Sequence, residues 1–225
     1  MNGENVADGA GITPRLAERL LAAGADVITL GNHVWRRREI APYLETAERV
    51  IRPANLASTT PGRGLVVVEA EDRTPVAVLN LQGMLFMGTQ TSPFEVVDEL
   101  VEEARAAAKI VLVDFHAEAT SEKVALSREL DGKVTAVFGT HTHVQTSDAR
   151  VQPGGTAAIT DAGMTGPHDS VIGVKAELAI GRMRTGMGVR FEPADGGVRI
   201  EGALVECDPA TGRAAKITPV RVPWP

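Results

Sequence analysis

Apolar and polar residues follow one another along the chain in blocks that predict alternating helices and strands. A helix is predicted from Thr13 to Gly24, because threonine caps a helix and glycine ends one. Residues 94–108 carry apolar side chains three and four positions apart, which is typical of an amphipathic helix. The continuous apolar run at 109–115 predicts a strand that is buried on both faces.

The remaining predicted elements are shorter. Residues 64–69 and 75–81 are expected to form a β-hairpin around the charged turn 71–73. The others are strands at 25–30, 50–51, 134–138 and 157–159, helices at about 36–45, 120–130 and 174–184, and a tail of alternating strands from about 188 to 222. Their order predicts a single α/β domain over residues 1–225, a layered sandwich with antiparallel additions and functional sites at the carboxyl ends of its strands.

Composition and charge narrow the classes of function. The net charge of −6 argues against strong binding of a nucleic-acid polymer, but it leaves a small phosphate ester open because bound metal ions reverse the local field. The one cysteine, Cys207, excludes an intrachain disulfide and suits a reducing compartment. No apolar run reaches the ~20 residues that span a bilayer, and the first residues do not form a signal peptide. We therefore expect a cytoplasmic protein without a membrane partner.

Four of the five histidines, His33, His116, His141 and His143, stand at or just beyond the ends of predicted strands. A lone histidine is usually a solvated surface residue. Four at equivalent strand ends point instead to metal binding, since neutral imidazole is a common ligand of Zn, Fe and Mn. Residues two apart in an extended segment face the same way, so His141 and His143 can face one cavity; the alternative is a pair of solvated loop histidines. The fifth, His168, falls in a loop rich in glycine and proline.

Oxygen donors lie beside these histidines. Asn32 offers an amide oxygen directly before His33, whose imidazole could then be an acid or base instead of a ligand. Glu4, which stands between the amides Asn2 and Asn5, is the carboxylate best suited to bridge two cations in a two-metal hydrolase. The alternatives are an Asn-His turn and a loose N-terminal tip.

Two further segments could contribute. Asp114 could orient His116 or hold the start of a helix, and Glu118 is expected to be structural or to support a ligand. Thr165 and Gly166 lie in a glycine-rich segment that could bind a substrate phosphate through backbone N–H groups; a flexible loop is the alternative. The sequence contains no Gly-x-Ser-x-Gly elbow and no Walker A ending, so a serine nucleophile and a P-loop are poorly supported.

Taken together, the polar motifs occur in an order that resembles the bacterial YmdB-like family of calcineurin-like metallophosphoesterases. The motifs are NGEN at 2–5, GNHVW at 31–35, DFHAEATSEK at 114–123, GTHTHVQT at 139–146 and TDAGMTGP at 160–167. The resemblance runs from residue 2 to about residue 173, and the tail fits more loosely. It implies a four-layer α/β/β/α sandwich and two metal ions, most often iron or manganese, with zinc or magnesium also open. It also implies phosphodiesterase activity on small phosphodiesters, notably 2′,3′-cyclic nucleotides, which are opened to 3′-nucleotides.

The resemblance also implies roles for individual residues. The implied metal ligands are Glu4 as a bridge, Asn32, His116 and His141 at one metal, and Asn5 and His143 at the other. The reaction implied is attack of a metal-bound hydroxide on phosphorus, while His33 protonates the departing sugar oxygen.

One departure from the family pattern bears on the metal count. The family pattern starts with an apolar strand ending in Gly-Asp and a helix, both before NGEN, and its aspartate is a ligand of the first metal. Here Met1 stands just before NGEN, so relative to the family we expect the chain to be N-terminally truncated, either because its start is misassigned or truncated or because the protein lacks these elements. One metal instead of two, with weak activity, is therefore an alternative. So are a regulatory or nucleotide-binding protein that keeps the fold, and a phosphomonoesterase. A homo-oligomer is also open.

Overall fold

The computed structural model describes residues 1–89 and 91–224. Its centre is a six-stranded sheet with the order β3-β4-β5-β6-β8-β7. The strands are β3 (Leu65–Glu69), β4 (Pro75–Gln82), β5 (Ile110–His116), β6 (Ala136–Thr140), β7 (Arg150–Val151) and β8 (Ala157–Ile159). Neighbouring strands from β4 to β8 run parallel, while the edge strands β3 and β7 are antiparallel to their neighbours. The predicted hairpin at 64–81 and the buried strand at 109–115 are thereby confirmed.

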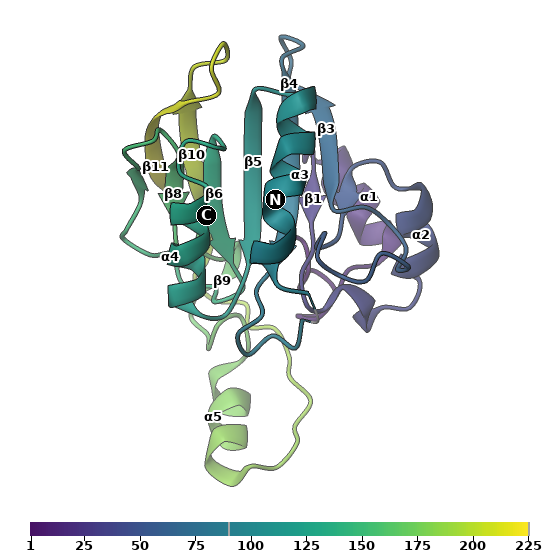
Figure 1. The fold of residues 1–225 in the computed structure, drawn as a ribbon. Helices are drawn as coiled ribbons and strands as arrows, with labels where there is room; N and C mark the ends of the chain where they lie inside the picture. The colour runs from purple at the N-terminus through teal and green to yellow at the C-terminus, as the bar shows by residue number, and fades with distance from the viewer. Residues whose placement is uncertain (90, 225) are drawn as a thin grey trace.

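Two helices, α3 (Pro93–Ala107) and α4 (Thr120–Glu129), cover one face of this sheet (Figure 1). The largest apolar cluster of the protein lies between them and the sheet. Phe115 of β5 is fully buried there, together with Val101 of α3 and Leu126 of α4. The apolar stripe predicted for residues 94–108 is therefore the face that packs on the sheet.

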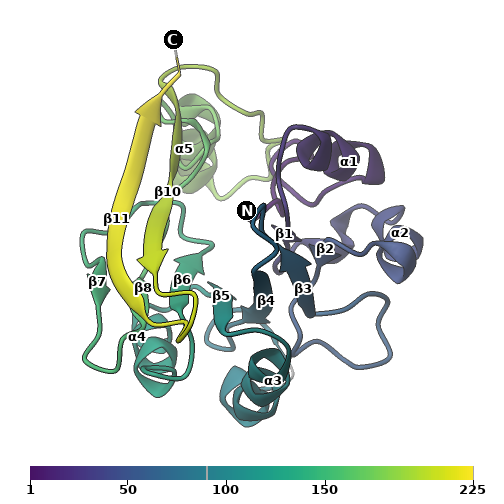
Figure 2. The same cartoon turned by 90° about the horizontal axis from the view of Figure 1, so that it is seen from above.

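A second layer of strands packs on the opposite face of the sheet (Figure 2). It consists of the parallel pair β1 (Ile28–Thr29) and β2 (Val50–Ile51), and of β9 (Gly166–Pro167), β10 (Val198–Cys207) and β11 (Ala214–Pro223). Ile51 of β2 packs near Val78 of β4, whereas Val205 and Ile217 of the β10–β11 hairpin pack near Ala157 of β8. Two β layers therefore meet face to face.

A fourth layer, formed by α1 (Pro14–Ala22), the 3-10 helix η1 (Val34–Arg36) and α2 (Ile40–Thr46), covers β1 and β2. Ile12, Ala17 and Leu44 lie in its buried cluster. The expected α/β/β/α order is thus confirmed over this half of the molecule. The last helix, α5 (Ala176–Thr185), projects away from the layers (Figure 1). Within residues 1–89 and 91–224, no helix has the length and apolar character needed to cross a bilayer.

The structure corrects two predictions about elements and adds two strands that were not predicted. The helix expected at 36–45 is divided, and α2 begins only at Ile40. The reason is Pro42, whose ring is tolerated in the first turn of a helix but not farther along it. In the tail, residues 188–192 do not form a strand, and one long hairpin follows instead. The short strands β7 and β9 were not predicted, because two residues give too little alternation to be recognised.

The register of the parallel strands brings three strand ends to one level. Gln82 of β4 pairs with His116 of β5, and His116 pairs with Thr140 of β6. The residues that follow these strands are therefore placed at a common edge of the sheet, next to the segment that follows β1. This is the edge at which the candidate site lies.

Candidate metal centre

His116, the last residue of β5, is the buried centre of the site. Its Nδ1 lies 2.9 Å from the hydroxyl of Thr140, which in turn donates its proton to the carboxylate of Asp114 at 2.7 Å. A hydroxyl has only one proton to donate, so Thr140 can only accept from His116. The proton of the neutral imidazole is thereby assigned to Nδ1, and the lone pair of Nε2 faces the site. Asp114 thus orients His116 through the hydroxyl of Thr140, which is how Asp114 could support a ligand.

Glu4 reaches the same point from the start of the chain. A parallel bridge between Asn2 and Thr29 places the NGEN segment beside β1. Both residues also donate to the buried carboxylate of Asp114, Thr29 through its hydroxyl and Asn2 through its amide. The Glu4 side chain is buried, and its Oε1 lies 2.9 Å from His116 Nε2. The N-terminal tip is therefore an ordered part of the site.

The Glu4 carboxylate is held in its ionised form. Burial raises the pKa of Glu4, but the contacts that its carboxylate makes with His116 and with the backbone N–H of His33 lower it by more, so the pKa lies below its usual value. The N–H of His33 donates to Glu4 Oε2 at 3.0 Å. A buried anion is consequently present at the point where the histidine rings meet.

The segment after β1 approaches so closely that residue 31 must be glycine. A Cβ on Gly31 would lie 2.3 Å from Cδ2 of His116 and 2.4 Å from Oε2 of Glu4. Both distances are far below van der Waals contact, and both neighbours are groups of the site itself. The glycine of the GNH motif therefore serves the close packing of the ligands.

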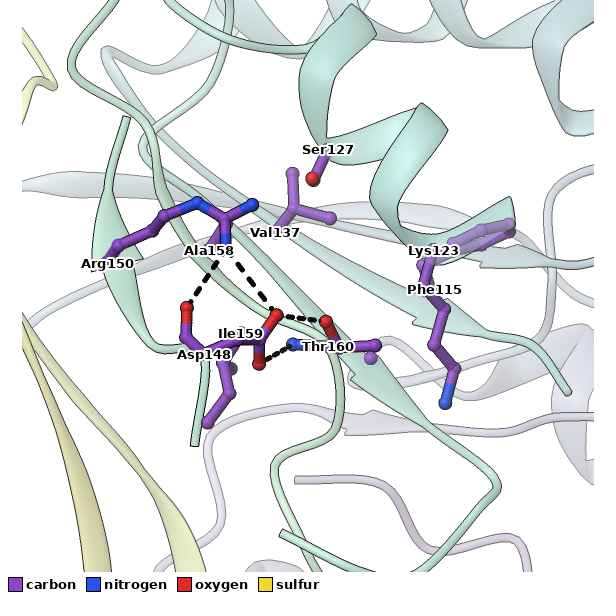
Figure 3. Close-up of a pocket in the computed structure, with 10 residues that line it drawn as sticks. Phe115, Lys123, Ser127, Val137, Asp148, Arg150, Ala158, Ile159 and Thr160 are labelled. Atoms are coloured by element: carbon purple, nitrogen blue, oxygen red, sulfur yellow. Dashed lines mark hydrogen bonds and ion pairs between the residues drawn. The ribbon is translucent and has the colours of Figure 1, made fainter. Parts of the chain in front are cut away.

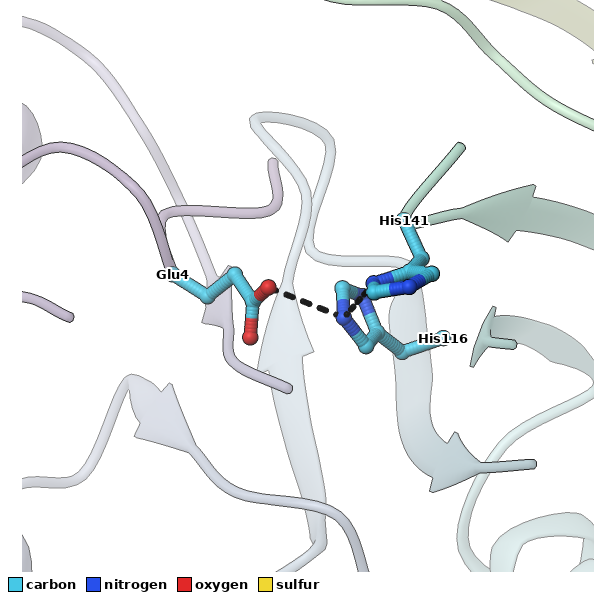
Figure 4. A group of neighbouring side chains, drawn as sticks. All are labelled: Glu4, His116 and His141. Carbon is cyan, nitrogen blue, oxygen red and sulfur yellow. Dashed lines mark hydrogen bonds and ion pairs between the residues drawn. The ribbon is translucent and has the colours of Figure 1, made fainter. Parts of the chain in front are cut away.

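Two further candidate ligands, Asn32 and His141, face the same atom of His116. Figure 4 shows His141 and Glu4 on either side of His116. Asn32 Oδ1 lies 2.9 Å from His116 Nε2, and His141 Nδ1 lies 3.2 Å from it. The other ring nitrogen of His141 faces Glu118 Oε2 at 3.0 Å. A carboxylate behind a histidine fixes the tautomer and leaves the opposite nitrogen free for a metal, which is the supporting role expected of Glu118.

These contacts are what a cation site requires. Lone pairs of Glu4, Asn32, His116 and His141 converge. With His116 protonated on Nδ1, no donor among residues 1–89 and 91–224 forms a hydrogen bond to Glu4 Oε1, and His33 Nδ1 lies 3.5 Å from it. Converging acceptors without a proton between them repel one another, whereas a metal ion satisfies all of them at once. Glu4, His116 and His141 have ligand atoms within 4.8 Å of one another. The donor set of nitrogen and oxygen atoms fits a transition or divalent metal.

His33, Asn5 and His143 form a second group beside this cluster. His143 Nδ1 lies 3.1 Å from the carbonyl oxygen of Ile172, so the proton of His143 is assigned to Nδ1. Its Nε2 then accepts from the Asn5 amide at 3.1 Å, while Asn5 Oδ1 faces His33 Nδ1 at 2.9 Å. Asn5 thus connects His33, the predicted general acid, to His143, a predicted metal ligand. That Asn5 and His143 bind a second metal stays a prediction.

The glycine-rich segment is fixed against the β10–β11 hairpin. The hydroxyl of Thr165 faces the carbonyl of Glu201 at 3.5 Å, and Gly166 pairs with Arg199 of β10. The buried carboxylate of Glu201 also lies 3.6 Å from His168, which accounts for the fifth histidine. Binding of substrate by Thr165 and Gly166 stays a prediction.

Sequence reasoning missed the side chains that hold the histidine turn. Lys123 and Asp161 form a buried ion pair, and both are hydrogen-bonded to the hydroxyl of Thr142, the residue between His141 and His143. Lys123 and Asp161 belong to motifs that were recognised, but their partners are 19 to 38 residues away along the chain. Because no local pattern signals such a contact, only the folded structure reveals it.

Comparison with known proteins agrees with this geometry. Residues 1–220 match the family described as YmdB-like protein. The chain belongs to the YmdB-like family. A Bacillus subtilis (strain 168) member, named 2′,3′-cyclic-nucleotide 2′-phosphodiesterase, is 46% identical over 217 residues, which cover 96% of this chain and 82% of the relative.

Two solved structures share the YmdB-like fold. A hypothetical protein from Thermus thermophilus superposes with a TM-score of 0.93 at 41% identity, over 100% of this chain and 86% of that one. A phosphatase from Mycoplasma pneumoniae superposes with a TM-score of 0.90 at 36% identity, over 99% of this chain and 80% of that one. The family and the metallophosphoesterase fold implied by the motifs are confirmed. The names of the relatives agree with the expected class of enzyme, a hydrolase of phosphoric esters.

Proposed function

We propose that this YmdB-like chain is a metal-dependent phosphodiesterase that opens 2′,3′-cyclic nucleotides to 3′-nucleotides. The observation that carries the proposal is the convergence of acceptor atoms from Glu4, Asn32, His116 and His141 on one point, with His33 attached to the same carboxylate. The identity of 46% to the Bacillus subtilis 2′-phosphodiesterase supports this substrate class.

Divalent metal ions fit this donor set, and we propose two of them, with iron or manganese preferred. Glu4, Asn32, His116 and His141 would hold the first. His143 with Asn5 would contribute to the second, in place of the hydrogen bond that joins their side chains. Bound metal ions would supply Lewis-acid polarisation of the phosphoryl oxygens and activation of the attacking water.

His33 would deliver a proton to the leaving sugar oxygen. Its Nδ1 is bonded to Asn5, so Nε2 is the nitrogen left for the substrate. Burial lowers the pKa of His33, and the nearby Glu4 carboxylate raises it in part. A proton held on Nε2 therefore depends on nearby negative charge, which Glu4 and the substrate phosphate both provide. Asn5 and the His33 N–H contact with Glu4 keep the ring oriented toward the site.

The decisive measurement is hydrolysis of 2′,3′-cyclic AMP by the full chain loaded with Mn²⁺ or Fe²⁺, with products separated by chromatography. We expect 3′-AMP as the product. His33→Ala should lower kcat by about 10²–10⁴, the usual contribution of a general acid. His168→Gln is the matched control, because His168 contacts Glu201 instead of the ligand cluster, and it should retain the wild-type rate. A folded, metal-loaded chain that leaves the cyclic diester intact would contradict the proposal.

A phosphomonoesterase is the second candidate, because the Mycoplasma pneumoniae neighbour is named a phosphatase. The same metal-loaded protein should then release inorganic phosphate from 3′-AMP or 5′-AMP faster than it opens the cyclic diester. A comparison of kcat/KM for the two substrate classes decides between them. Nucleotide binding without turnover of either class would instead favour a regulatory protein.

A further inference from the structure

The two histidines of the GTHTH motif lie in an unusual backbone conformation. His141 has φ 94° and His143 has φ 65°, both in the left-handed region that residues with a Cβ disfavour. Thr142 lies between them. A turn with two such residues persists only when its surroundings hold it in place.

The surroundings that hold this turn are the buried side chains of Asp161 and Lys123. Asp161 Oδ2 accepts the backbone N–H of Thr142 at 3.1 Å and its hydroxyl at 2.6 Å. Lys123 Nζ, which arrives from α4, donates to the Thr142 hydroxyl at 2.8 Å and to the same carboxylate oxygen at 3.1 Å. Asp161 and Lys123 are almost fully buried, at 1% and 3% exposure. A buried charge pair with satisfied partners fixes geometry more strictly than an exposed pair.

Lys123 has another carboxylate in its neighbourhood but does not use it. A small cavity of about 10 Å³ is lined by its stem and by Asp148, Arg150 and Thr160. Figure 3 shows the ammonium group pointing away from Asp148, which is bonded to Thr160 and paired with Arg150. Lys123 therefore donates its hydrogen bonds to Asp161 and Thr142.

The Asp161 carboxylate reaches beyond the histidine turn. Its Oδ1 accepts the N–H of Gly163, in the glycine-rich segment that precedes Thr165. One carboxylate therefore fixes both the turn that carries His141 and His143 and the start of a second loop. Loss of this anchor would release both loops together.

We propose that Asp161 and Lys123, acting through Thr142, are positioning residues that set His141 and His143 in the geometry needed for metal binding. The inference rests on the proposed metal-dependent function. None of the three side chains is itself a metal ligand in this assignment. Their effect is on metal affinity, because a turn free to relax from its left-handed conformation no longer presents both imidazoles to the site.

Binding of Mn²⁺ alone to the metal-free full chain tests this inference, with the free Mn²⁺ signal followed by electron paramagnetic resonance. Thr142→Val keeps the shape of the side chain and removes the hydroxyl. We expect its Mn²⁺ affinity to fall by about tenfold or more, as for other groups that support a ligand. Thr142→Ser restores the hydroxyl and should restore the affinity. Thermal unfolding of each metal-free variant separates this effect from a loss of folding.

The double variant Lys123→Met/Asp161→Asn removes both charges together, so that neither is left buried alone. It should show the same loss of Mn²⁺ affinity as Thr142→Val. Lys133→Met is the matched control: Lys133 also pairs with carboxylates, Asp98 and Glu129, but on the surface. Its affinity should equal that of the wild type.

Wild-type Mn²⁺ affinity in both Thr142→Val and the double variant would overturn the inference, and so would an equal loss in Thr142→Ser and Thr142→Val. A wild-type chain that binds Mn²⁺ but hydrolyses no phosphodiester would contradict the proposed function alone. The affinities of the variants would then still decide the positioning role. A wild-type chain that binds no Mn²⁺ would contradict both.

Discussion

At the scale of single residues, the position of the proton on each histidine ring decides which nitrogen can bind a metal. Thr140 assigns the proton of His116 to Nδ1, and the carbonyl of Ile172 does the same for His143. In each case the hydrogen bond on one side of the ring makes the other nitrogen an acceptor. His141 is oriented in the opposite sense by Glu118, so that its Nδ1 faces the cluster. Partners outside the cluster thus decide which nitrogens can bind a metal.

Two histidines of the site, His33 and His141, make the free energy of unfolding depend on pH. Burial lowers the pKa of His33 below its usual 6.5, with the Glu4 carboxylate opposing, and burial is also the main cause that lowers the pKa of His141. Both rings therefore bind a proton more weakly in the folded chain than in the unfolded chain. Their contribution is present above about pH 6.5 and is lost as the pH falls through the folded pKa.

We therefore expect the free energy of unfolding of the metal-free protein to decrease from about pH 7.5 to about pH 5.5, because the unfolded chain takes up more protons. Urea unfolding in the presence of a chelator measures it. The double variant His33→Gln/His141→Gln should flatten this slope. A stability that is constant or increases toward low pH in the wild type would contradict the assignment.

At the scale of elements, loops at the site are fixed by side chains that replace missing backbone partners. The loop after β4 is an example. Asn55 accepts the N–H of Gln82 and donates to its carbonyl, and Glu122 of α4 accepts the N–H groups of Met84 and Leu85. The Glu122 side chain is buried, whereas Met84 and Leu85 are exposed, so Glu122 holds an exposed loop against α4.

Glu122→Ala should lower the free energy of unfolding by about 1.5–3 kcal/mol, because it removes hydrogen bonds to a charged carboxylate. Hydrogen exchange at Met84 and Leu85 should increase at the same time. Glu129→Ala is the control on the same helix. Its exposed pair with Lys133 contributes only about 0.5 kcal/mol. Unchanged exchange at residues 84 and 85 would show that Glu122 does not hold the loop.

At the scale of the whole molecule, the metal cluster lies where two halves of the fold meet. Glu4 and Asn32 come from the half with β1, β2 and the helices that cover them. His116 and His141 come from the ends of β5 and β6 in the large sheet. A bound cation would therefore connect the halves, and its binding free energy would add to the stability of the whole fold.

We expect Mn²⁺ to stabilise the protein by about 2.7 kcal/mol when free metal is a hundredfold above the dissociation constant. The melting temperature, followed by circular dichroism, should increase with Mn²⁺ and return to its starting value with a chelator. Glu4→Gln, which removes the anionic ligand, should lose most of the increase. A melting temperature that does not respond to metal would argue against a cation between the halves.

The sequence by itself determined the elements with strong periodicity and the chemistry of the ligands. The stripe at 94–108, the buried run at 109–115 and the five polar motifs depend on neighbouring residues, so their signals are local. The motifs also identified the family and the layered fold. The start of α2 and the two-residue strands were not predicted correctly, because so few residues show no periodic arrangement of apolar side chains.

Only the tertiary structure decided how these residues act on one another. The choice of nitrogen in His116, the link from His143 through Asn5 to His33, and the anchoring of Thr142 by Asp161 all join residues far apart in the chain. Such contacts exist only after burial has removed water as a competing partner. Because a hydrogen bond gains its selectivity from that desolvation, the sequence can name the groups but cannot assign their partners.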